Sequence, residues 1–201
     1  QRLPKATLVL NRGFEILPEV AGMVDGVAAE SLFREWDAEA RRYVEVSAAD
    51  RRWLQQALER VVHRHHLPVT VIDYLPPSQR REARALAARI AALGYTPWVA
   101  SALLDSMGVG AVEVLPRTVL MLYDGAEAPT LAESAPHRLG AMPLEHMGYA
   151  VEYLDVRSGA LPSGSLAGRY AGVVTWFTDD ALPQPARLRR FLSSLLEDGV
   201  R

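Results

Sequence analysis

Hydrophobic and polar positions follow a regular order along the first 116 residues. Short apolar runs alternate with longer stretches in which apolar residues recur at helical spacing. The runs predict strands at Thr7–Leu10, Gly26–Ala29, Pro68–Tyr74 and Pro97–Ala100, and the stretches predict helices at Ala48–His63 and Ser78–Leu93. Strands that alternate with helices in this way are typical of a parallel α/β sheet.

The pattern changes near Pro116, and residues 117–201 predict a second α/β unit. Its expected strands are Arg117–Asp124, Ala150–Val156 and Tyr170–Phe177, and its expected helices are Leu139–Met147 and Pro185–Asp198. The order strand, helix, strand, strand, helix favours an open Rossmann-like or flavodoxin-like sheet. Because the last helix should lead into another strand, we expect this unit to be incomplete. The chain is therefore divided into units at residues 1–116 and 117–201.

Composition and charge narrow the class of protein. The 201 residues are 49% hydrophobic and 23% charged, which is typical of a globular protein with a sizeable core. A formal net charge of −2 offers no attraction for a phosphate backbone, so no nucleic-acid partner is expected. The absence of cysteine excludes a cysteine nucleophile and a thiolate metal site. No apolar run approaches the roughly 18 residues of a membrane span, so we do not expect a transmembrane protein.

Glu30 is the first candidate for chemistry, because it directly follows the apolar run that begins at Gly26. A strand that ends in a glutamate places a carboxylate at the carboxyl edge of its sheet, where α/β folds hold their active sites. A carboxyl group at such an edge is suited to acid catalysis. The alternative is a surface glutamate that caps the next helix.

Polar and aromatic residues also end the neighbouring predicted strands. The side chains in question are Asn11, Arg12, Asp73, Tyr74 and Trp98. If the strands are parallel neighbours, these groups converge on one side of the sheet. An aromatic ring beside carboxylates and amides suits a sugar, which stacks on rings and demands directional hydrogen bonds. Two alternatives stay open: Trp98 packs in the interior, and Asp73 holds a neighbouring loop.

Three segments resemble one enzyme family. They are GFEILPEVAGMVDGVAAESLF, VIDYLPP and YTPWVAS, and with their intervals they resemble the endo-α-1,4-polygalactosaminidase family over residues 6–116. The resemblance implies the C-terminal half of a (β/α)8 TIM barrel, followed by part of a Rossmann-like domain. It implies that Glu30 is the catalytic glutamate at the end of the sixth barrel strand. It also implies that Asn11, Asp73, Tyr74 and Trp98 line the same cleft.

The chain departs from the family pattern at one catalytic position. Family members use a second carboxylate, an aspartate at the end of the fourth strand, and this chain begins at the fifth. Glycoside hydrolysis usually requires two carboxyl groups. Asp25 precedes its strand, so Asp73 is the one candidate inside the chain. An open half barrel would also expose strand edges and a large apolar face, so we expect either a fragment of a longer enzyme or a chain that pairs with a missing piece. In both cases we expect the chain to be inactive alone.

These observations support two hypotheses of different classes. The first is a periplasmic or secreted glycoside hydrolase that cleaves an α-linked galactosamine or N-acetylgalactosamine exopolysaccharide of a biofilm matrix. The second is a carbohydrate-binding or scaffolding module of an exopolysaccharide assembly complex. In both hypotheses the partner is an amino-sugar polysaccharide, and exopolysaccharide assembly proteins are further candidate partners.

Two other motifs predict no site. His63, His65 and His66 offer metal-binding groups, but they lie at a predicted helix end, where cationic side chains are favoured by the helix dipole. Gly108 and Gly110 lack the third glycine and the strand-to-helix context of a dinucleotide site. We therefore expect neither a metal nor a cofactor.

Polar residues at element ends of the second unit leave one weaker alternative, a ligand crevice of a nucleotide-using domain. Helix caps and solvated loops explain the same residues more simply. They are Asp124, Glu145, His146, Asp179 and Asp180.

Overall fold

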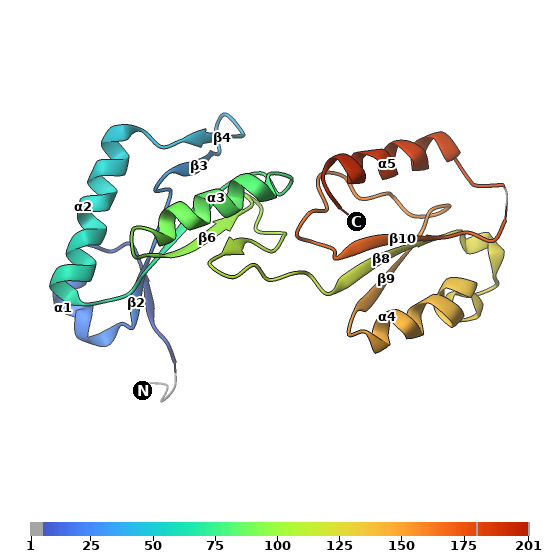
Figure 1. Cartoon of the computed structure of the whole chain (residues 1–201), viewed down its shortest axis with the longest axis horizontal. Helices are drawn as coiled ribbons and strands as arrows, with labels where there is room; N and C mark the ends of the chain where they lie inside the picture. Colours follow the sequence, from blue (N-terminus) through green and yellow to red (C-terminus); the bar gives the residue numbers. More distant parts are fainter. Residues whose placement is uncertain (1–5, 180, 201) are drawn as a thin grey trace. The chain divides into compact units, whose positions relative to one another are not determined.

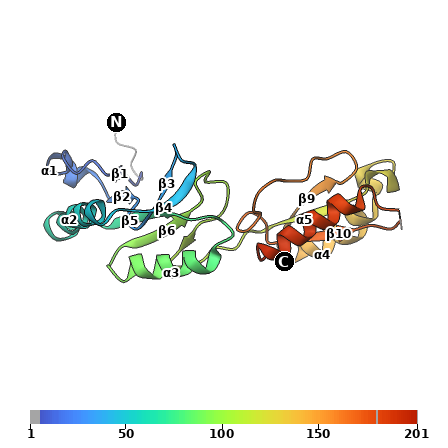
Figure 2. The same ribbon diagram turned by 90° about the horizontal axis from the view of Figure 1, so that it is seen from above.

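The computed structural model describes residues 6–179 and 181–200, which fold into two units (Figures 1 and 2). One unit comprises the described residues up to Leu104 together with Gly108–Val114. The other comprises Asp105–Met107 and the described residues from Leu115 onward. Each unit has its own sheet and its own hydrophobic core.

A five-stranded sheet forms the centre of the first unit, in the order β1-β2-β5-β6-β7. Its strands are β1 (Val9–Asn11), β2 (Gly26–Glu30), β5 (Val69–Tyr74), β6 (Thr96–Ala100) and β7 (Val109–Gly110). The first four are parallel, which confirms the predicted strands with small shifts at their ends, and β7 is antiparallel. The sheet is open, with β1 and β7 as its edges, so the described residues do not close a barrel.

Two amphipathic helices cover one face of this sheet. Helix α2 (Ala48–His65) begins where the Ser47 hydroxyl accepts a hydrogen bond from the Asp50 amide at 3.1 Å, and it ends at His66 in a left-handed conformation. Helix α3 (Arg80–Ala91) is shorter at both ends than its predicted range. The buried side chains of helices and strands form one core: Val27, Ala29, Leu54, Leu58, Val61, Val71, Ala83, Leu86, Ile90 and Val99.

The opposite face of the sheet remains partly exposed. Successive side chains of a strand point to opposite faces, so the neighbours of the core residues lie on this second face. They include Ala28, Glu30, Thr70, Ile72, Tyr74 and Trp98, and each of these is partly exposed. The polar strand ends therefore belong to the face that the helices leave uncovered.

Two small features of the first unit were not predicted. Helix α1 (Leu17–Val20) continues into the 3-10 helix η1 (Ala21–Met23). Strands β3 (Arg34–Asp37) and β4 (Arg42–Glu45) form a hairpin after β2. These elements are too short to produce a clear hydrophobic period.

The second unit contains a three-stranded parallel sheet in the order β10-β8-β9. Its strands are β8 (Thr118–Tyr123), β9 (Ala150–Asp155) and β10 (Gly172–Trp176), which confirms the predicted strands. With the first strand between the second and the third, this is the order in which flavodoxin-like sheets begin. Helix α5 (Pro185–Glu197) packs Leu188 and Leu195 on the face of the sheet that carries Leu120 and Leu122.

The prediction of a single helix at Leu139–Met147 is wrong about where the helical segment begins and about its type. A π-helix, η4 (Pro136–Ala141), leads into the short α-helix α4 (Met142–His146). Pro143 has no backbone N–H, so it cannot donate the α-helical hydrogen bond to the carbonyl of Leu139. Gly140 lies close to Trp176 and Met121, so this segment covers the face opposite α5 (Figure 1). The 3-10 helices η2 (Gly125–Glu127) and η3 (Leu131–Glu133) precede it.

Replacement of Leu58 tests the core of the first unit. Leu58 is 0% exposed, so the Leu58→Ala substitution should leave a cavity and lower the free energy of unfolding by about 3 kcal/mol. The matched control is Leu103→Ala, because Leu103 is 81% exposed and should change the stability by less than about 0.5 kcal/mol. Urea unfolding followed by circular dichroism measures both. Equal stability of the two variants would contradict the assigned core.

Candidate active site

Glu30 lies at the carboxyl end of β2, between side chains from the strands on either side. The Tyr74 hydroxyl, from β5, donates a hydrogen bond to Glu30 Oε2 at 2.6 Å. The Asn11 amide, from β1, donates to Glu30 Oε1 at 3.2 Å. The two donors hold one carboxylate oxygen each, so the orientation of the Glu30 side chain is fixed from both sides.

Arg12 contacts the backbone of Glu30 rather than its carboxylate. Its guanidinium donates to the Glu30 carbonyl oxygen at 2.7 Å. Arg12 itself has φ 54°, a left-handed conformation that turns the chain at the end of β1. Arg12 is exposed, and the bond that it donates to Glu30 is to the backbone and not to the carboxylate.

Asp73 does not face the surface around Glu30. It is 0% exposed, and its carboxylate accepts the backbone N–H groups of Leu32 at 2.7 Å, Phe33 at 2.9 Å and Arg34 at 3.1 Å. These contacts favour the alternative that Asp73 holds a loop, while its place in a substrate cleft stays a prediction. The reason that Asp73 does not face the surface around Glu30 is strand alternation: Asp73 and Tyr74 are adjacent in β5, so their side chains point to opposite faces.

Trp98 shares the exposed face with Glu30 and lies two strands away from it. Ile72 pairs with Glu30 on one side and with Trp98 on the other, so the three residues lie on one rung of the sheet. Two strand spacings separate Glu30 from Trp98 by about 10 Å. The indole is partly exposed and lies so close to Gly108 that an added Cβ would be 2.5 Å from it. The absence of a side chain at Gly108 therefore lets the Trp98 ring pack against this residue, while part of the ring remains accessible.

The environment of Glu30 changes the acidity of its neighbours. Burial, together with the hydrogen bond to Glu30, raises the pKa of Tyr74 to about 12, so Tyr74 is a firm hydrogen-bond donor at neutral pH. Burial also raises the pKa of Asp73, against the opposing effect of its three backbone donors and of Arg89. The phenol and the carboxylate of Glu30 therefore form a donor–acceptor pair.

The arrangement can bind hydroxyl groups and transfer a proton. Glu30 presents a fixed carboxylate on a partly exposed face, with an amide and a phenol beside it. Both oxygens of Asp73 are engaged by backbone donors, so Asp73 is not free to act as a second carboxyl group. Glu30 is thus the candidate, among the described residues, for one carboxyl group of the pair that glycoside hydrolysis usually requires.

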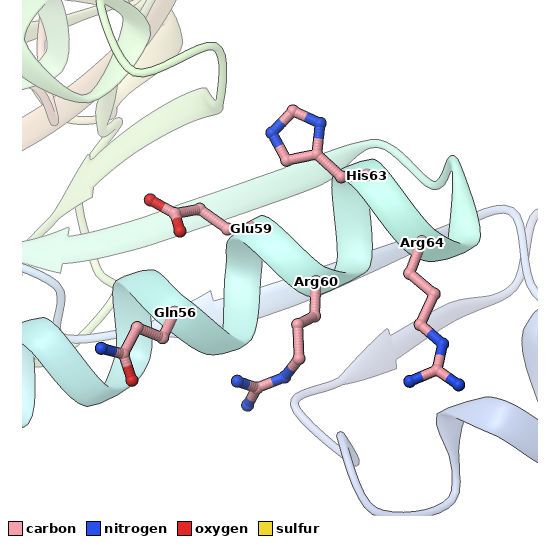
Figure 3. Close-up of a pocket in the computed structure, with 5 residues that line it drawn as sticks. All are labelled: Gln56, Glu59, Arg60, His63 and Arg64. Carbon is pink, nitrogen blue, oxygen red and sulfur yellow. The ribbon is translucent and has the colours of Figure 1, made fainter.

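The histidine motif lies on and beyond the last turn of α2. Figure 3 shows the His63 ring on a different side of the helix from Arg60 and Arg64. His66 follows as the left-handed residue that ends the helix. Among the described residues, no group of three or more His, Asp or Glu side chains is arranged to hold a metal ion.

The acidic residues of the second unit are mostly engaged within the unit. Asp124 accepts two hydrogen bonds from the Arg157 guanidinium at 2.8 and 2.6 Å, and Arg157 lowers the pKa of this carboxyl group. Asp124 also accepts the Ala126 amide at 2.9 Å and so begins η2. The Glu127 carboxylate accepts the backbone N–H of Asp179 at 3.1 Å. Glu145 and His146 lie in α4, and Asp180 lies outside the described residues.

Sequence reasoning missed an aromatic pair on the hairpin that follows Glu30. The Trp36 and Tyr43 rings are 4.8 Å apart in an edge-to-face arrangement, and both residues are partly exposed. The Tyr43 hydroxyl accepts a hydrogen bond from the Ala102 amide at 3.1 Å, which ties the hairpin to the carboxyl end of β6. The signal was two aromatic residues flanking a polar turn, REWDAEARRYVE.

Comparison with known families assigns the class of protein. The family model for glycoside-hydrolase family GH114 matches residues 1–115, more than half of the chain. The chain belongs to this family of glycoside hydrolases.

Among solved structures, the chain is similar to the glycoside hydrolase domain of PelA from Pseudomonas aeruginosa. The two are 48% identical with a TM-score of 0.50, over 53% of this chain and 42% of that domain. A variant of the same domain matches at 48% identity and a TM-score of 0.49, over 51% of this chain and 40% of that one. The chain therefore spans less than half of the PelA domain that it matches. No curated protein matches the chain significantly.

Substitution of Asp73 tests its part in holding the loop after Glu30. An asparagine keeps one oxygen acceptor of similar shape and leaves buried backbone donors unpaired, so Asp73→Asn should lower the free energy of unfolding by about 2 kcal/mol. The matched control is Asp25→Asn, an exposed residue that accepts one backbone amide, with an expected loss below about 0.5 kcal/mol. Chemical denaturation measures both losses, and similar values would refute the loop-holding role.

Titration of Tyr74 tests the contact with Glu30. The pKa of Tyr74 in the folded protein is raised to about 12 from an ordinary 10.0. Its contribution to stability should therefore be complete below pH 10.0 and be lost as the pH rises through about 12. The phenolate absorbance of the unsubstituted chain minus that of Tyr74→Phe should titrate with a midpoint at about 12 while circular dichroism reports a folded chain. A midpoint at the ordinary value would mean that the contact does not exist in solution.

Proposed function

We propose that the protein to which this chain belongs is a glycoside hydrolase that cleaves an α-linked galactosamine or N-acetylgalactosamine exopolysaccharide. The observation that carries the proposal is the fixed position of Glu30 on the exposed face of the sheet, within the part of the chain that matches GH114. Similarity at 48% identity to the PelA glycoside hydrolase domain supports it. The substrate class follows from the family resemblance.

In the proposed reaction Glu30 is the general acid or the nucleophile. As an acid it would protonate the glycosidic oxygen; as a nucleophile it would form a covalent glycosyl intermediate that water then hydrolyses. Tyr74 and Asn11 orient its carboxylate, and Arg12 holds its backbone. The partly exposed ring of Trp98, on the same face, offers a stacking surface for a neighbouring sugar.

The second carboxyl group is proposed to come from another part of the protein. The parallel strands β1, β2, β5 and β6 are interpreted as the later half of a (β/α)8 barrel, whose earlier half would bring an aspartate to the Glu30 face. Supporting this interpretation, Asp73 is engaged by backbone donors, and the chain covers 42% of the PelA domain. On this proposal the chain alone is inactive.

The proposed setting is the periplasm or the cell exterior, where a biofilm matrix polymer is made or degraded. Every described helix is too short or too polar to pass through a lipid bilayer. The proposed partners are the amino-sugar polymer and proteins of exopolysaccharide assembly.

A second candidate function is a carbohydrate-binding or scaffolding role without catalysis. It is favoured by the second unit, where Asp124 is paired with Arg157 and the Glu127 carboxylate accepts the Thr178 hydroxyl at 2.7 Å. Carboxylates that are engaged in this way stabilise loops and are not available for catalysis.

Replacement of Glu30 in the full-length protein separates the two functions. Glu30→Gln keeps the shape of the side chain and removes its acid, so cleavage of a partly deacetylated α-1,4-linked N-acetylgalactosamine polymer should fall about 1,000-fold. Reducing-end assays measure the rate, and circular dichroism verifies the fold.

The matched control for this experiment is Glu59→Gln, on the outer surface of α2, which should leave the cleavage rate unchanged (Figure 3). Retained cleavage in Glu30→Gln would refute the catalytic role of Glu30. Polymer binding by the unsubstituted full-length protein with no cleavage would instead support the scaffolding function.

A further inference from the structure

A cavity lies apart from Glu30, between the β3–β4 hairpin and the helices α2 and α3. Its volume is about 330 Å³, within the range of cavities that hold small molecules. Phe33 and Leu75 supply part of an apolar wall. Glu30, Asn11 and Tyr74 are not among its lining residues, so the cavity is separate from the candidate active site.

Three arginines converge on this cavity. Arg89 lies over the Phe33 ring, with its guanidinium carbon 3.8 Å from the ring centroid, and Arg51 lies over the same ring at 5.3 Å. Arg34 lines the cavity beside them. The ring attracts each cation, but the like charges still repel one another in a partly enclosed space. A group of cations that shares one cavity favours an anion there.

Two of these arginines contain buried donors without a partner. Arg34 Nε and Arg51 Nε are both buried, and neither makes a hydrogen bond within the described residues. Guanidinium donors are strong, and a buried donor left unpaired carries a free-energy cost. A bound anion would satisfy such donors, because guanidinium groups match the two oxygens of a carboxylate.

The arginines of the cavity are unequally paired with carboxylates. The lining includes the arginines Arg34, Arg51 and Arg89 and the glutamates Glu45 and Glu82, and Arg89 also interacts with the buried carboxylate of Asp73. Glu45 is a weak partner, because its side chain is 77% exposed and approaches Arg34 only to 3.9 Å. Glu45 therefore neutralises Arg34 only weakly, and a small anion in the cavity would pair with this guanidinium more closely.

We propose that this cavity binds a small carboxylic acid in its ionised form. The carboxylate would lie between the guanidinium groups of Arg34 and Arg51, and its apolar body would contact Phe33, Leu75 and Leu86. Because Phe33 and Arg34 also donate their backbone N–H groups to Asp73, the ligand would contact the loop that follows Glu30.

Binding of benzoate to the chain tests this site. Calorimetric titration should show saturable binding with one benzoate per chain, whereas benzamide, the neutral analogue, should bind at least tenfold more weakly. Phosphate should also bind more weakly than benzoate, because it has no apolar body to contact Phe33 and Leu75. Phosphate binding as tight as that of benzoate would overturn the carboxylate assignment, and the absence of saturable benzoate binding would overturn the site.

Substitutions locate the binding. Arg51→Gln should weaken benzoate binding at least tenfold, and Arg60→Gln, on the outer surface of the same helix, should leave it unchanged (Figure 3). If Arg51→Gln fails to fold, Arg34→Gln decides, because Arg34 supplies the other guanidinium group of the proposed site and its side chain is partly exposed. Binding that survives substitution in a folded variant at either cavity arginine would refute the proposal.

Discussion

The Glu30 region depends on one buried carboxylate, that of Asp73. Its two oxygens accept three consecutive backbone N–H groups, from Leu32 to Arg34, and so fix the path of the chain as it leaves β2. This constraint determines where Glu30 ends its strand, where the β3–β4 hairpin begins and where Phe33 meets the arginines of α2 and α3. A single side chain on the helix-covered face thereby organises features on both sides of the sheet.

Strand alternation distributes the chemistry of the first unit between the two faces. The helix-covered face contains the apolar core and Asp73, and the other face presents Glu30 and Tyr74. A carboxylate on the covered face is engaged by the backbone and serves structure, whereas a carboxylate on the exposed face keeps contact with solvent and with a ligand. Glu30 and Asp73 lie at the ends of adjacent strands, but their side chains lie on opposite faces of the sheet and therefore have different surroundings.

Sequence reasoning predicted the strands and long helices of both units, because each has a clear hydrophobic period. It also identified Asn11 and Tyr74, which the structure places in contact with Glu30. It did not separate Asp73 from Tyr74, since a strand end does not reveal which of two adjacent residues faces the core. The π-helix η4 was also missed, because its formation depends on Pro143 and on the packing of Gly140 against Trp176 rather than on local propensity.

The edge strand β1 has a practical consequence for work with this chain. Within the described residues it pairs only with β2, and Val9 on this strand is 56% exposed. An exposed parallel edge with apolar side chains is a template for another strand. In isolation the chain is therefore expected to associate through this edge.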